Sequence, residues 1–199
     1  MSFFDTAAIF NYHRQMIDAC GPQSSLALGW KDRESQRSRF RALATIGELN
    51  NRSVLDVGCG YGDLLPYLAA RCNRLNYTGV EQIPELLHEA IKRYGDHPEA
   101  SFIHGDFTTM QLTPADYVFA SGSLNYRSVD PEFIFKIITK FYGACRIAFA
   151  FNLLSDIVPN GMLVAYDPDE INAYCNKLCN NVKLLKGYAA DDFTVFMYR

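Results

Sequence analysis

The chain has 199 residues, of which 49% are hydrophobic and 21% charged, a composition typical of a globular protein and not of a disordered one. Its length allows one domain with a short extension and argues against two full domains. The 19 basic and 22 acidic residues give a net charge of -3, which disfavours a protein that binds nucleic acid through bulk positive charge.

The N-terminus lacks the basic and long apolar regions of a signal peptide, and the most apolar stretch, residues 147–151, is too short to cross a bilayer. We therefore expect a cytoplasmic protein that does not span a membrane. In that compartment the six cysteines are expected to be free thiols. Cys175 and Cys179 share a helix face, but no further Cys or His pair lies near them in the sequence, so no metal site is expected.

Hydrophobic periodicity predicts two helices before residue 50, over residues 5–19 and 34–48, with a break at Gly21-Pro22. The basic run from Lys31 to Arg41 is usually explained as a solvated helix face. From residue 53 onward, short apolar strands alternate with helices. Strands are predicted at 53–57, 77–81, 101–104, 115–120, 146–151, 182–185 and 193–198, and helices from the glycine-rich turn to about 70, at 84–94, at 131–142 and from 167.

The alternation predicts an α/β fold, in which a mostly parallel sheet is covered by helices on both faces. The last two strands differ, because the connection between 182–185 and 193–198 is too short for a helical crossover. These two strands are therefore expected to be antiparallel neighbours.

Chemistry-bearing residues follow three successive strands, at the carboxyl edge where open sheets bind ligands. The first strand leads into Asp56-Val-Gly58-Cys59-Gly60-Tyr-Gly62, whose glycines let the backbone turn tightly and approach a ligand closely. Asp56 either orients this turn or meets a cationic group. Glu81 ends the second strand, where an acid can accept both hydroxyls of an adenosine ribose. Asp106 and Phe107 follow the third strand and offer an acceptor for an adenine amino group and a wall for its ring.

Each of these features also has a purely structural interpretation. Glycine turns occur without ligands, Glu81 can be a solvated strand end, and Asp106 can cap a turn. A nicotinamide-binding domain is the nearest alternative fold, but its fingerprint needs Gly or Ala three residues after the second glycine, where this chain has Asp63.

Three segments, Val-Leu-Asp56-Val-Gly58-Cys-Gly60-Tyr-Gly62, Gly79-Val-Glu81 and Gly105-Asp106, resemble the class I S-adenosylmethionine-dependent methyltransferases. The resemblance implies a three-layer sandwich around a seven-stranded sheet with the last strand inserted antiparallel. It implies a methyltransferase domain over residues 51–199, with residues 1–50 as a helical lid of the same domain. It also implies that S-adenosylmethionine binds and leaves as S-adenosylhomocysteine. The cofactor residues it points to are Asp56, Gly58, Cys59, Gly60, Gly62, Glu81, Gln82, Asp106, Phe107, Ser121 and Gly122.

The loop after the fourth strand, Ala120 to Tyr126, bears on the methyl acceptor. It lacks both the Pro-Pro-aromatic pattern of amino-methylating DNA enzymes and the Pro-Cys of cytosine-carbon methyltransferases. With a net charge of -3, we expect a small-molecule acceptor, methylated by in-line displacement. Candidate substrate-facing residues are Asn125 and Tyr126 on this loop and Tyr12 and His13 on the lid, with packing or surface roles as alternatives. No catalytic base is assigned.

Two lid residues are expected at the cofactor. Arg39 suits a bidentate contact with the cofactor carboxylate, and Trp30 is placed to cover the bound cofactor. The alternative to an enzyme is a non-catalytic module that binds S-adenosylmethionine for regulation or as a scaffold. The oligomeric state does not follow from the sequence.

Overall fold

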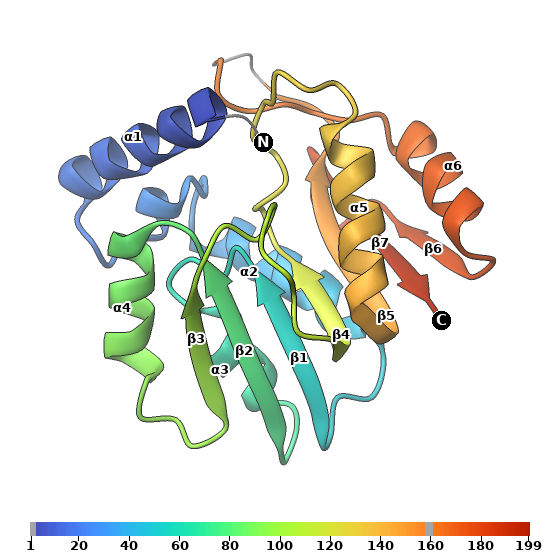
Figure 1. The fold of residues 1–199 in the computed structure, drawn as a ribbon, viewed down its shortest axis with the longest axis horizontal. Helices are drawn as coiled ribbons and strands as arrows, with labels where there is room; N and C mark the ends of the chain where they lie inside the picture. The colour runs from blue at the N-terminus through green and yellow to red at the C-terminus, as the bar shows by residue number, and fades with distance from the viewer. Residues whose placement is uncertain (1–2, 158–160) are drawn as a thin grey trace.

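The computed structural model describes residues 3–157 and 161–199 and shows a seven-stranded sheet between layers of helices (Figure 1). The strand order is β3-β2-β1-β4-β5-β7-β6. Strand β7 is antiparallel to both of its neighbours, β5 and β6, while the pairs from β3 to β5 are parallel. This confirms the predicted fold class and the antiparallel pair at the end of the chain. The strands are β1 (Arg52–Val57), β2 (Leu75–Glu81), β3 (Ala100–His104), β4 (Ala115–Ala120), β5 (Cys145–Leu154), β6 (Val182–Leu185) and β7 (Asp192–Tyr198).

The central strands are buried on both faces because helices cover both, and successive side chains enter opposite cores. On β4, Tyr117 and Phe119 enter the core under helices α2 (Arg33–Leu43) and α3 (Leu64–Ala69). Val118 and Ala120 enter the core under α5 (Phe133–Ala144) and α6 (Pro168–Leu178). Helix α4 (Pro84–Tyr94) packs beside β2 and β3.

The N-terminal segment, residues 3–50, is attached to the sheet in two different ways. Helix α2 and the short 3-10 helix η2 (Ala44–Ile46) are part of the core, since Phe40, Leu43, Ile46 and Leu49 are buried against the sheet. Helix α1 (Phe3–Cys20) and the 3-10 helix η1 (Ser25–Leu28) pack instead on a small separate cluster. This places α1 beyond the carboxyl ends of the strands (Figure 1).

Some element boundaries differ from the sequence prediction. The helix expected over 34–48 ends at Leu43, where the chain tightens into η2 before Gly47. Helix η1 was not predicted, because four residues are too few to show a period; the Ser24 side chain caps it and Gly29, at φ 82°, ends it. Strand β5 continues to Leu154. All six cysteines are unpaired, and no helix in the described ranges is both long and apolar enough to cross a membrane.

Ile138 of α5 is fully buried in the core, so truncating its side chain should destabilise the protein strongly. We expect Ile138→Ala to lower the free energy of unfolding by about 2–5 kcal/mol, because it removes buried methyl groups and leaves a cavity. The matched control is Ile91→Ala on α4, where the side chain is 47% exposed and the cost should stay below about 1 kcal/mol. Urea unfolding measures both, and equal losses would contradict this assignment of the core.

Candidate functional site

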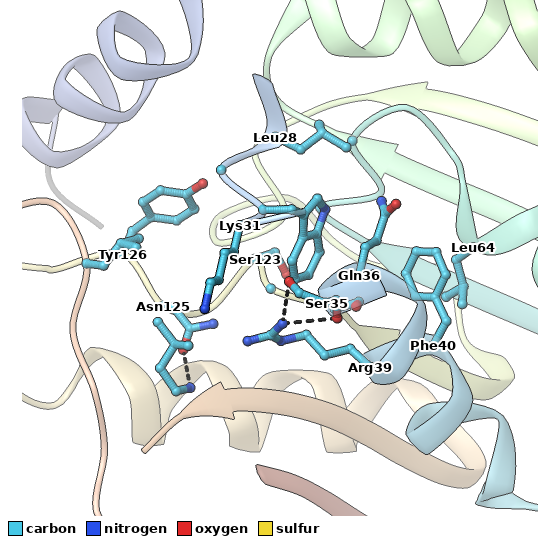
Figure 2. Close-up of a pocket in the computed structure, with 18 of the residues that line it drawn as sticks. Leu28, Lys31, Ser35, Gln36, Arg39, Phe40, Leu64, Ser123, Asn125 and Tyr126 are labelled. Carbon is cyan, nitrogen blue, oxygen red and sulfur yellow. Dashed lines mark hydrogen bonds between the residues drawn. The ribbon is translucent and has the colours of Figure 1, made fainter. Parts of the chain in front are cut away.

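A cavity of about 880 Å³ lies at the carboxyl ends of β1, β2, β4 and β5. The sheet supplies its floor, and the N-terminal segment covers it. Lys31, Gln36 and Arg39 from that segment and Ser123, Asn125 and Tyr126 from the loop after β4 line the same space (Figure 2).

The glycine turn after β1 forms part of the floor, and its geometry requires glycine. Gly58 and Gly60 have φ angles of 73° and 56°, which L side chains rarely adopt. A Cβ on Gly58 would lie 2.4 Å from Cβ of Ser123, and one on Gly60 would lie 2.8 Å from Cδ2 of Leu28. The turn is fixed to β2, since the N–H groups of Gly58 and Cys59 both donate to the carbonyl of Val80.

Glu81 is buried beside this turn, and its carboxylate is largely occupied by backbone groups. Oε2 accepts from the Gly60 N–H at 2.9 Å, and Oε1 accepts from the N–H groups of Gln82 and Ile83 at 2.8 and 2.9 Å. Burial raises the pKa of Glu81, although these three hydrogen bonds favour the charged form. Glu81 therefore holds the glycine turn and the start of α4 together, and a carboxylate has room for about one more donor.

Asp56 is the second buried carboxylate of the floor. Its Oδ2 accepts a hydrogen bond of 2.6 Å from the Tyr77 hydroxyl, while Oδ1 has no hydrogen-bond partner within the described part of the chain. Burial raises the pKa of Asp56 to about 7; the Tyr77 hydrogen bond lowers it, and the charges of Glu81 and Asp63 raise it further. An unpartnered acceptor atom on a cavity wall is a binding group for a ligand that donates a proton or carries positive charge.

The roof over this floor is built around Trp30 and Arg39. The Trp30 ring packs on Gly122 so closely that a Cβ there would lie 2.6 Å from Cη2. The Arg39 guanidinium lies 5.1 Å from the centre of the Trp30 ring, and its Nε donates to Oδ2 of Asp192 at 2.6 Å. One terminal nitrogen of Arg39 donates to the carbonyl and hydroxyl oxygens of Ser35 (Figure 2). The sequence-predicted Arg39 is thus on the cavity wall, but it is paired with a carboxylate of the protein itself.

Asp192 connects this roof to the floor through a chain of buried and partly buried hydrogen bonds. The Tyr188 hydroxyl donates to Oδ1 of Asp192. Nδ2 of Asn152 donates to the hydroxyls of Thr194 and Tyr188 at 2.7 and 3.3 Å, and the Ser121 hydroxyl donates to Oδ1 of Asn152 at 3.1 Å. Burial raises the pKa of Asp192 to about 6, against the opposing effect of Arg39. The network joins α2, the loop after β4, β5 and β7.

His13 and Tyr126 meet at another wall of the cavity. His13 is buried and its Nε2 lies 2.7 Å from the Tyr126 hydroxyl, while its Nδ1 lies 3.0 Å from the carbonyl oxygen of Ala27. Asn125 is fixed beside them, because its Oδ1 accepts from the Leu154 N–H at 2.8 Å.

The structure brings most of the sequence-predicted site residues to the cavity, and three lie outside its lining. Asp106 caps a turn, since its Oδ1 accepts from the N–H and hydroxyl of Thr108. Tyr12 packs edge-on against His13 beside Gly29, and Gly62 faces Phe102 and Tyr94. The residues on the lining are Trp30, Arg39, Asp56, Gly58, Cys59, Gly60, Glu81, Gln82, Phe107, Ser121, Gly122, His13, Asn125 and Tyr126.

Sequence reasoning missed Leu28, Tyr188 and Asp192. Leu28 belongs to a helix too short to predict, and Tyr188 follows β6 in a polar loop without a motif. Asp192 acquires its role only through Arg39, which lies 153 residues away in the sequence. The described residues contain no group of three or more His, Cys, Asp or Glu side chains arranged to hold a metal ion.

Comparison with known proteins identifies the class of this fold and cavity. A family model described as "Methyltransferase domain" matches residues 54–146. The chain is 33% identical over 155 residues to a Mycobacterium tuberculosis protein named as a methyltransferase with no acceptor in its name, and the match covers 73% of this chain and 92% of that protein. It is 27% identical over 139 residues to trans-aconitate 2-methyltransferase of Klebsiella pneumoniae, covering 69% of this chain and 47% of that enzyme.

Solved structures share the fold at low sequence identity. The magnesium protoporphyrin IX methyltransferase of Synechocystis PCC 6803 with bound SAH aligns with a TM-score of 0.66 at 14% identity, over 83% of this chain and 82% of that chain. The DhpI–SAH complex aligns with a TM-score of 0.68 at 14% identity, over 94% and 93%. The fold is thus that of the Rossmann-like methyltransferases. The match to the family model and the similarity to the M. tuberculosis relative show that this chain belongs to the class I S-adenosylmethionine-dependent methyltransferases.

The cavity fits this cofactor on two observations. The turn at Gly58 and Gly60 is a backbone cradle in which a Cβ has no room. The buried, unpartnered Oδ1 of Asp56 needs a donor, and the ammonium of the methionine moiety is one.

Breaking the buried ion pair between Arg39 and Asp192 should lower the free energy of unfolding more than breaking an exposed pair. The side chains are 6% and 0% exposed, so Arg39→Ala leaves an uncompensated buried carboxylate and should cost about 3–5 kcal/mol. The double variant Arg39→Ala/Asp192→Ala should cost less than the sum of the two single substitutions. The control is Arg14→Ala, which breaks a similar pair between the Arg14 Nε and the Glu85 carboxylate. The Arg14 and Glu85 side chains are 53% and 39% exposed, so the free energy of unfolding should fall by less than about 1 kcal/mol. Additive losses in chemical denaturation would contradict the pairing.

Proposed function

We propose that this methyltransferase transfers the methyl group of S-adenosylmethionine to a small molecule held in the same cavity. The observation that supports this is the lining of the cavity: Trp30 and Arg39 form a roof over part of it, and His13 and Tyr126 form one wall. Its volume of about 880 Å³ lies in the range of small-molecule pockets, roughly 300–1,000 Å³. The cofactor supplies an activated methyl group, so the protein chiefly aligns the acceptor and excludes water.

The proposed cofactor contacts follow from the free binding groups of the floor and roof. Gly58, Cys59 and Gly60 cradle the methionine part, and Oδ1 of Asp56 accepts from its ammonium. The remaining acceptor position of Glu81 receives a ribose hydroxyl. Among the described residues, the second terminal nitrogen of Arg39 makes no hydrogen bond, which leaves it for the cofactor carboxylate. Gln82, Phe107, Ser121, Gly122 and Trp30 complete the proposed cofactor wall.

The proposed acceptor subsite lies between the N-terminal segment and the loop after β4, where His13, Asn125 and Tyr126 face the cavity. A subsite of this size beneath the N-terminal segment favours a small molecule over a nucleic acid. The match covers 47% of the K. pneumoniae relative named for trans-aconitate, so that molecule is a useful probe and does not by itself define the acceptor. The cytoplasmic location stays a prediction from the sequence.

Asp56 makes the affinity for the cofactor depend on pH. Its pKa of about 7 lies above its ordinary value of 3.8, so below pH 7 the free protein holds a proton on this carboxyl group. A bound ammonium favours the carboxylate, so binding releases that proton. Affinity for S-adenosylhomocysteine should rise by up to about tenfold per pH unit between pH 5.5 and 7 and level off above. Calorimetry measures this, and Asp56→Asn should bind more weakly and lose the slope. Parallel pH profiles for the two proteins would remove Asp56 from the cofactor contact.

The function is tested by following a labelled methyl group. The protein is incubated with S-adenosylmethionine labelled at the methyl carbon and with three separate cell-extract fractions: small molecules, proteins and nucleic acids. We expect S-adenosylhomocysteine to form and the label to enter the small-molecule fraction. Label in protein or nucleic acid would contradict the small-molecule acceptor, and cofactor binding without turnover would favour a non-catalytic module.

Two glycine variants control this experiment. Gly58→Ala should lose turnover and S-adenosylhomocysteine binding, because the new Cβ meets Ser123 at a backbone angle that alanine rarely adopts. Gly143→Ala in α5 places its Cβ in open space and should retain both.

A further inference from the structure

The hydrogen bonds of His13 fix which of its nitrogens carries the proton. The Ala27 carbonyl oxygen can only accept, so the 3.0 Å contact requires a proton on Nδ1. In the neutral ring Nε2 is then an acceptor, and the Tyr126 hydroxyl 2.7 Å away donates to it. The phenolic proton is therefore committed to His13, and the Tyr126 oxygen can offer only lone pairs to a ligand in the cavity.

The surroundings keep this pair neutral in the resting protein. Burial lowers the pKa of His13, and the carbonyl of Ala27 only partly offsets this. Burial also raises the pKa of Tyr126, with smaller contributions from Tyr12 and from the charge of Glu81. Tyr12 meets the His13 ring edge-on with centroids 5.2 Å apart. No ion pair reaches either residue within the described part of the chain, so Nε2 is an unprotonated base at neutral pH.

We propose that Tyr126 and His13 form a proton relay for the methyl acceptor, which attacks through a hydroxyl or amine group that loses a proton. This rests on the proposed function and narrows its acceptor class. The acceptor O–H or N–H bond breaks as its proton passes to the Tyr126 oxygen, and the phenolic proton passes to Nε2 of His13. The acceptor atom gains the methyl group, and the electron pair of the broken carbon–sulfur bond stays on sulfur.

Charge balance supports this relay. Methyl transfer removes the positive charge of the sulfonium, and the relay creates one on the His13 imidazolium, so the net charge of the site is conserved. A carboxylate acceptor carries no proton at neutral pH, so its methylation would not need the relay. Tyr126 touches the acceptor and is the catalytic residue; His13 acts through it as the positioning and proton-storing residue.

The first test needs no acceptor. Nitrogen-15 NMR of the protein saturated with S-adenosylhomocysteine reports the protonation of each His13 nitrogen. We expect the neutral form with hydrogen on Nδ1 between pH 6.5 and 8, and Tyr126→Phe should leave that tautomer unchanged while shifting Nε2. A proton on Nε2, or an imidazolium at pH 7, would overturn the relay. Absence of any ligand-induced shift would instead count against the proposed function.

The second test compares methyl transfer to hydroxyl, amine and carboxylate compounds, with trans-aconitate among the last. Tyr126→Phe and His13→Gln should each lose at least about 100-fold of the transfer to hydroxyl or amine acceptors, because the step loses its base. Affinity for S-adenosylhomocysteine should be unchanged, and added imidazole should restore activity to His13→Gly. Transfer to carboxylates alone, or full activity in Tyr126→Phe, would overturn the proposal.

The controls are a tyrosine and a histidine remote from the cavity. Tyr174→Phe removes a hydroxyl that bonds Thr139 between α6 and α5, and His88→Gln alters an exposed histidine of α4. Both should transfer methyl groups at the wild-type rate. A loss in these variants equal to that in Tyr126→Phe would mark the effect as structural and overturn the relay.

Discussion

Two buried carboxylates without a cation determine the character of the cavity. Asp56 and Glu81 lie at the carboxyl ends of two paired strands, β1 and β2, and neither makes an ion pair in the ranges 3–157 and 161–199. Burial raises the pKa of both. Glu81 is compensated by three backbone N–H groups, which order the glycine turn and the first turn of α4, whereas Asp56 has one hydroxyl. The folded protein thus holds buried carboxylate groups that lack a positively charged partner, and a cationic ligand would stabilise them.

The parts of this site that the sequence predicts are those created by local chain geometry. Asp56 and Glu81 lie in the last residues of β1 and β2, the glycine turn follows β1 directly, and parallel strands bring their carboxyl ends to one edge. Their positions therefore follow once the strands are recognised. Asp106 lies after β3 as expected, and its Oδ1 accepts from the N–H and hydroxyl of Thr108, two residues on. Position after a strand does not determine which local donor a side chain will choose.

The remaining parts arise from contacts between segments that are distant in the sequence. Arg39 was recognised as a cavity cation, but its partner Asp192 follows a loop without any motif. His13 and Tyr126 were singled out separately, and only the fold brings them within a hydrogen bond across 113 residues. A single sequence records residue types and spacing, while pairings of this kind depend on how α1 and α2 pack on the finished sheet.

The position of β7 has a consequence for the order in which the protein assembles during synthesis. This strand lies between β5 and β6 and supplies both Asp192 and Thr194 to the network under the roof. The glycine turn and the parallel strands can form early, but Arg39 has no counter-charge until residues 192–198 have emerged. Until then β5 lacks its antiparallel partner, and an unpaired sheet edge makes a partly folded chain prone to associate.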